Sequence, residues 1–137
     1  MILTLLAQSI LFIWFLGCTV SYRTKKWVLV DGMGLKSYEF GMLCFYTAGV
    51  ILYHTCNAVG KWFLLAVLGI WAVVQFFCHW YYTLFGASTQ KLKGYNECFR
   101  DTVKIFPPSE TRLLPDLYHV ILHALILWNL VTVLIRL

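Results

Sequence analysis

Four long apolar runs constrain the fold of this chain more than any other feature. They cover residues 2–20, 38–56, 62–85 and 117–135. Each run approaches the ~20 residues that an α-helix needs to cross ~30 Å of hydrocarbon. Hydrophobic residues make up 61% of the 137 residues and charged ones only 12%, whereas a soluble domain carries about 25% charged residues. The sequence predicts an all-α integral membrane protein, a single domain over residues 1–137 with four transmembrane helices in a bundle.

The first apolar run has the length of a helix and also resembles a secretory signal sequence. It lacks a basic segment at its start, and residues 16–19 (Leu-Gly-Cys-Thr) are a poor site for signal peptidase. We therefore expect residues 2–20 to be retained as the first membrane helix.

The basic residues indicate the orientation of the chain. Nine of the eleven lie in loops 21–37 and 86–116: Arg23, Lys25, Lys26, Lys36, Lys91, Lys93, Arg100, Lys104 and Arg112. Because cytoplasmic loops are enriched in Lys and Arg, we expect both loops in the cytoplasm and both termini outside, in the cell (plasma) membrane. These charges do not indicate nucleic-acid binding, because the chain has no DNA- or RNA-binding motif. The lipid bilayer is the expected partner.

The two cytoplasmic loops carry local patterns of their own. In the first, the apolar stretch 27–30 precedes Asp31-Gly32-Met33-Gly34, which predicts a turn within a small hairpin at the membrane surface. In the third loop of the chain, apolar residues recur at helical spacing over residues 94–106. This spacing predicts a short amphipathic helix in the interface, ended by Pro107-Pro108.

Aromatic residues at the ends of the apolar runs are typical of the membrane interface. Trp and Tyr are enriched there because their rings are apolar and their tips are polar. We therefore expect interface anchors at five positions: Tyr38, Trp80, Tyr81, Tyr82 and Tyr118.

Ionisable residues inside the last two apolar runs are the main functional clue. Asp116, His119 and His123 are three and four residues apart, and Gln75 and His79 are four apart. Such spacings place side chains on one face of a helix. Ionisable groups in membrane segments are costly and usually face a partner, a cavity or a ligand.

The histidines of the two runs are expected to lie at similar depth. At ~1.5 Å per residue, His79 lies about 9 Å from the cytoplasmic end of its helix, and His119 and His123 lie about 5 and 10 Å from the same boundary. Glu39 and Asp116 begin the second and fourth helices at that boundary. Three imidazoles and two carboxylates are therefore expected to converge near the cytoplasmic face.

This set suits a divalent metal ion, zinc or iron. His79, His119 and His123 would be ligands, and Glu39 or Asp116 would be a further ligand or a catalytic general base. A metal-bound water would then be the nucleophile. The leading hypothesis is a metal-dependent membrane enzyme that acts on a lipid-like substrate, hydrolysis being one reaction open to it.

Three alternatives remain open at this stage. Haem could bind between His79 and either His119 or His123, although one histidine would then have no role. A small transporter or channel would need a homo-oligomer, and a second polar layer near the other membrane face would belong to its path. In a non-catalytic membrane subunit, the polar residues would cap helices or join them. The second layer consists of Thr4, Gln8, His54, Asn57, Asn129 and Thr132.

Overall fold

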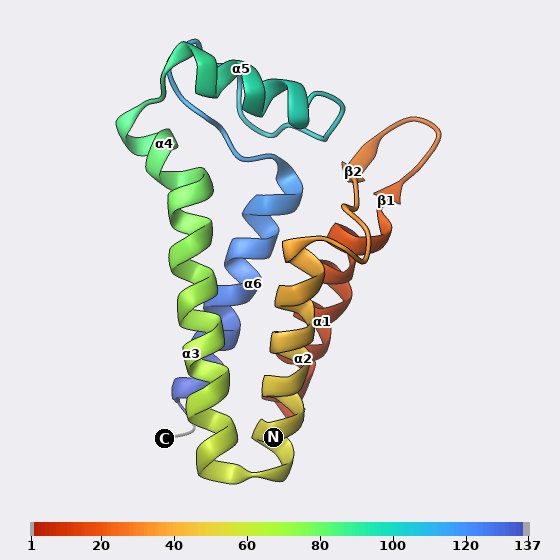
Figure 1. Cartoon of the computed structure of the whole chain (residues 1–137), viewed down its shortest axis with the longest axis vertical. Coiled ribbons are helices and arrows are strands. Elements are labelled where there is room, and N and C mark those ends of the chain that lie inside the picture. The colour runs from red at the N-terminus through yellow and green to blue at the C-terminus, as the bar shows by residue number, and fades with distance from the viewer. Residues whose placement is uncertain (1, 136–137) are drawn as a thin grey trace.

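Four long helices lie side by side along the longest axis of the molecule (Figure 1). They are α1 (Ile2–Val20), α2 (Tyr38–Thr55), α3 (Asn57–Gln75) and α6 (Leu117–Leu134). The structure is a computed structural model that describes residues 2–135. The prediction of a mostly helical chain is confirmed.

Three helical stretches are long and apolar enough to cross a membrane. They are Ile2–Val20, Ala58–Phe85 and Leu117–Leu134, which supports a membrane location. Helix α2 does not reach the same hydropathy, because its 18 residues include Glu39, His54 and three tyrosines. The structure therefore accounts for three of the four predicted spans.

The turn between α2 and α3 is tighter than expected. Only Cys56 separates the two helices, so α3 begins five residues before the predicted start at residue 62. A Cβ atom on Gly60 would lie 2.0 Å from the carbonyl oxygen of Leu52. Glycine is therefore required where the two helices approach. The side chain of Asn57 lies outside the described part of the chain.

Helix α3 continues through a π-helical turn. This turn, η1 (Phe76–Trp80), leads into α4 (Tyr81–Phe85), where the sequence predicted one regular helix. A π turn shifts the faces of the residues that follow it, and such turns are frequent at functional sites. His79 lies within this turn.

The first loop forms the expected hairpin, but its turn is at another place. Strand β1 (Tyr22–Arg23) pairs antiparallel with β2 (Val28–Val30). The backbone N–H of Thr24 donates to the carbonyl of Trp27 at 2.9 Å, and the Thr24 hydroxyl accepts from the Trp27 N–H at 3.3 Å. The prediction of a turn at residues 31–34 was wrong, because this side-chain-supported turn closes the hairpin earlier.

The surface helix of the third loop also lies earlier than predicted. Helix α5 (Thr89–Cys98) begins where the Ser88 hydroxyl accepts from the Lys91 N–H, so the predicted range 94–106 was wrong. The segment after α5 instead pairs with the hairpin, since the Val103 N–H donates to the Val28 carbonyl at 3.1 Å. This long-range contact outweighs the helical pattern of residues 99–106.

The hairpin and α5 lie at one end of the helices (Figure 1). The α2–α3 turn lies at the other end, together with the start of α1 and the end of α6. The two loops that hold most basic residues therefore share one end of the molecule, as the sequence predicted.

Aromatic contacts between helices form much of the core. The rings of Phe15 and Trp71 lie 4.2 Å apart between centroids, and Tyr46 lies 5.8 Å from Trp71. Trp14 of α1 donates from Nε1 to the Tyr118 carbonyl at 3.1 Å, and the Tyr118 hydroxyl donates to the Trp14 carbonyl at 2.6 Å. Tyr118 is fully buried. The prediction that it is an interface anchor was therefore wrong.

Candidate functional site

Three histidines meet near the hairpin end of the bundle. His79 lies in η1 and is 6% exposed, while His119 and His123 lie in α6 and are 8% exposed. The ring centroids of His79 and His119 are 4.4 Å apart, and those of His79 and His123 are 5.3 Å apart. The imidazoles of the two helices therefore lie together at one depth, as the spacing predicted.

Asp116 fixes which ring nitrogen of His119 carries a proton. Asp116 is the N-cap of α6, and its Oδ1 accepts from the backbone N–H of His119 at 3.0 Å. The same oxygen lies 2.7 Å from His119 Nδ1. Because a carboxylate only accepts, Nδ1 carries a proton, so Nε2 is the nitrogen that has a lone pair when the ring is neutral. His119 is thereby arranged as a base.

The ionisation of Asp116 is consistent with this role. Burial raises the pKa of its carboxyl group, but the hydrogen bonds and positive charge that His119 supplies lower it more. The net pKa of Asp116 lies below its ordinary value. The carboxylate therefore stays ionised behind the ring of His119.

Tyr95 holds His79 in the other tautomer, in which Nε2 carries the proton. Its hydroxyl oxygen lies 2.8 Å from His79 Nδ1, and burial raises the pKa of Tyr95, so the hydroxyl keeps its proton. Within residues 2–135 this nitrogen is the only hydrogen-bond partner of the Tyr95 hydroxyl. Since a buried donor needs an acceptor, Tyr95 donates to Nδ1 and His79 carries its proton on Nε2.

His123 differs from the other two histidines because both of its nitrogens are occupied. Its Nδ1 accepts from Trp80 Nε1–H at 2.6 Å. Its Nε2–H donates to Gln75 Oε1 at 2.9 Å. In this arrangement neither nitrogen is available to a metal ion. Trp80, which was predicted only as an interface anchor, orients His123 inside the bundle.

A cavity of about 410 Å³ lies beside His79 and His119. Glu39 lines the same cavity, together with apolar side chains such as Phe15 and Leu122. Asp116 lies behind His119, outside the lining residues. His123 lines a separate space of about 150 Å³ between α3 and α6. Of the five predicted site residues, three therefore line the cavity, Asp116 lies behind one of them, and His123 lines a separate space.

Neither a metal ion nor a haem is accommodated by the present positions of the histidines. Within residues 2–135, no group of three or more His, Cys, Asp or Glu side chains is arranged to hold a metal ion. A haem bound between His79 and His119 would need a porphyrin plane between rings that are now in contact at 4.4 Å. Either cofactor would require these side chains to move.

The second polar layer consists of contacts between helices. His54 Nε2 lies 2.8 Å from Gln8 Oε1, which joins α2 to α1. The Tyr46 hydroxyl lies 3.3 Å from Asn129 Oδ1, and Asn129 Nδ2 donates to the Ala7 carbonyl at 3.0 Å. This layer joins α1, α2 and α6 near the end opposite the cavity.

Sequence reasoning missed three residues of the site. Tyr95 was placed only within the predicted surface helix 94–106, Trp80 was predicted as an interface anchor, and Gln75 was placed only on one helix face with His79. No local pattern identifies them, because their partners lie 16, 43 and 48 positions away in the sequence.

No protein-family model, curated protein or solved structure matches this chain.

Proposed function

We propose that this protein is a small membrane enzyme that hydrolyses an ester of a lipid-like molecule by acid–base catalysis. The supporting observation is the 2.7 Å contact of Asp116 Oδ1 with His119 Nδ1. It leaves a basic nitrogen on a ring that lines the cavity and touches His79. His119 and His79 are the proposed catalytic residues, and Asp116 is a positioning residue.

The proposed topology has four membrane helices. Helix α2 has the same 18-residue length as α6 and packs against both α1 and α3, which supports a fourth span in spite of its lower hydropathy. The positive-inside rule then assigns the hairpin and α5 to the cytoplasm and both termini to the outside. The proposed location is the plasma membrane, with the site at its cytoplasmic face.

The proposed reaction uses the two rings in opposite roles. His119 Nε2 accepts a proton from water while the water oxygen bonds to the carbonyl carbon of the ester. The carbonyl electron pair moves to oxygen, and His79 Nε2–H donates to the resulting oxyanion. The intermediate then collapses to the acid, and the leaving alkoxide takes the proton from His119. The carboxylate of Asp116 stabilises the imidazolium form between these steps.

Hydrolysis of fluorogenic fatty esters by the protein in lipid nanodiscs tests this proposal. We expect turnover by the unaltered protein, and a loss of about 10²–10⁴-fold in His119→Gln, the usual contribution of general acid–base catalysis. His54→Gln is the matched control, because it changes a membrane histidine at the opposite end. Equal turnover in His119→Gln and the unaltered protein, or no turnover of any ester, would reject the proposal.

A second candidate function is a zinc or iron site on the same residues. His119 Nδ1–H donates to Asp116, as metal-ligating histidines donate to an outer partner. In a metal site His79 Nδ1–H would donate to the Tyr95 hydroxyl in the same way, the reverse of the direction in the acid–base site. The Nε2 atoms of both histidines have no hydrogen-bond partner within residues 2–135. Glu39 lines the same cavity, and a third ligand from it would complete a two-histidine, one-carboxylate set.

Elemental analysis separates the two candidates. The metal candidate predicts one zinc or iron per chain and its loss in a His79→Ala, His119→Ala double variant. His123→Ala should retain the metal, because both nitrogens of His123 already have partners. Ester hydrolysis that persists in metal-depleted protein would favour the acid–base candidate.

A further inference from the structure

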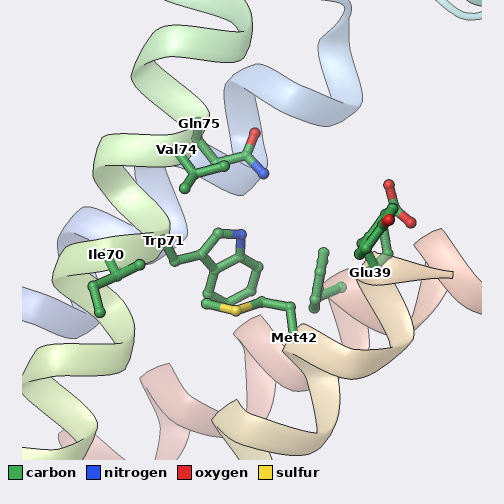
Figure 2. A pocket seen from close by; sticks show the side chains of 8 residues that line it. Glu39, Met42, Ile70, Trp71, Val74 and Gln75 are labelled. Carbon is green, nitrogen blue, oxygen red and sulfur yellow. The ribbon is translucent and has the colours of Figure 1, made fainter.

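An apolar groove of about 220 Å³ lies between α2 and α3 (Figure 2). Met42 of α2 lies across from Trp71 of α3, with Ile70 beside it. Glu39 and Gln75 lie at the other end of this set of side chains. The groove is therefore apolar along its length and polar at one end.

The groove and the histidine cavity are adjacent. Five residues line both of them: Phe15, Tyr38, Glu39, Val74 and Gln75. On the groove wall Ile70 is 64% exposed and Val74 is 50% exposed, although both belong to a stretch that is apolar enough to span a membrane. In the proposed topology this wall faces lipid. A molecule could therefore extend from the bilayer into the cavity without passing through water.

The charge of the shared polar end restricts what binds there. The residues that line the groove and the cavity include the carboxylates Glu39 and Asp31, and none of these described lining residues is Lys or Arg. Two cations contact lining residues without lining the cavity themselves. Arg23 is paired with Asp31 at 3.3 Å, and Lys104 Nζ donates to the Thr102 hydroxyl at 3.1 Å. A phosphate group in the cavity would lie near Glu39 without a cation among the lining residues, which is unfavourable in a partly buried site.

We infer that the groove binds the hydrocarbon chain of a single-chain carboxylic ester whose polar end carries no negative charge, such as a monoacylglycerol. The volume of the groove lies below the about 300–1,000 Å³ of usual ligand pockets, which suits one chain rather than two. The ester reaches His119 and His79 sideways from the bilayer, with its chain along Met42, Ile70 and Trp71. This inference rests on the proposed function and specifies its substrate class.

Photocrosslinking tests where the chain lies. A monoacylglycerol with a diazirine in its chain is added to the protein in nanodiscs, and adducts are located by mass spectrometry. We expect adducts to concentrate on the peptides that contain Met42 and Ile70. Ile70→Trp, which fills the groove, should reduce them about tenfold. Val59→Trp is the control, since Val59 is 71% exposed and does not line the groove. Adducts spread equally over the lipid-facing helices would overturn the inference.

Competition tests the charge of the polar end. An unlabelled monoacylglycerol should displace the probe, whereas a lysophosphatidic acid of the same chain length should compete at least about tenfold less well. In Glu39→Gln the two lipids should compete more equally with the probe. In the exposed Glu97→Gln the difference between the two lipids should be the same as in the unaltered protein. Equal competition by both lipids in the unaltered protein would overturn the assignment of an uncharged or cationic polar end.

The binding readout keeps this inference separate from the proposed reaction. Adducts in the groove of a protein that hydrolyses no ester would support the groove and reject the proposed hydrolysis. Hydrolysis whose chain-length preference is the same in Ile70→Trp and in the unaltered protein would support the reaction and overturn the groove.

Discussion

The two polar layers of this protein contain similar residue types but use them differently. In the layer of Gln8, His54 and Asn129, side chains bond to one another across helices. Gln8 also lines a space of about 310 Å³, and its Nε2 has no hydrogen-bond partner within residues 2–135, but this layer presents no histidine nitrogen to that space. In the layer of His79 and His119, each ring is held at Nδ1 and its Nε2 has no hydrogen-bond partner within the described chain. Both of these rings line a cavity.

This difference distinguishes polar residues that join helices from polar residues that face a ligand. A buried polar group that is fully paired stabilises one arrangement of the helices. A group that is oriented on one side and free on the side of a cavity can exchange protons with a bound molecule. The type of residue and its depth do not separate these cases. The distinguishing feature is a histidine nitrogen, such as Nε2 of His119, that has no partner within the described chain while the ring lines a cavity.

Asp116→Asn gives the largest effect expected from a residue that does not contact substrate. Asparagine retains the N-cap bond but provides a neutral acceptor, which no longer stabilises the imidazolium form of His119. We expect kcat to fall about 10²-fold with KM unchanged, and the acid limb of its pH profile to shift. Asp116→Glu should restore part of the rate, whereas a purely structural residue would leave the pH profile as it is.

Tyr95→Phe should have a smaller effect on the same layer. It removes the donor to His79 Nδ1, so the proton of His79 is no longer directed to Nε2. We expect kcat to fall about tenfold, the lower end of the effect of outer orienting partners. The comparison is with Tyr82→Phe, which lies outside the cavity and should retain the full rate.

Asn129→Leu should affect stability rather than chemistry. It removes the bond to the Ala7 carbonyl between α6 and α1, and such bonds in membrane proteins contribute about 0.6–1.7 kcal/mol. We expect a lower Tm in nanodiscs and an unchanged kcat per folded molecule. A large loss of kcat at an unchanged Tm would contradict the division between the layers.

Acid should affect stability through Asp116, and this is the smallest effect expected. Because the pKa of its carboxyl is lowered in the folded protein, the stabilising contribution is present above the ordinary pKa of about 4 and is lost as the pH falls through the folded value. The Tm of the unaltered protein should fall more steeply below about pH 4 than that of Asp116→Asn. The exposed Asp101→Asn, by contrast, should behave like the unaltered protein.

Several elements follow from local sequence patterns, and others do not. The apolar runs located the four long helices, because helix length and hydropathy are local properties. The positions of α5 and of the hairpin turn were wrong, since Thr24, Ser88 and the pairing of Val103 with Val28 decide them. No repeat in the sequence marks the π turn around His79.

The sequence by itself indicated a membrane location and a common level for His79, His119 and His123, because these depend only on hydropathy, helical rise and the spacing of polar residues. Only the tertiary structure decided which nitrogen of each ring is occupied. Tyr95 bonds to His79 from α5, and Gln75 bonds to His123 from α3. The repeat of polar and apolar residues along one helix does not indicate which residues of another helix it will contact. The chemistry of each histidine follows from these partners.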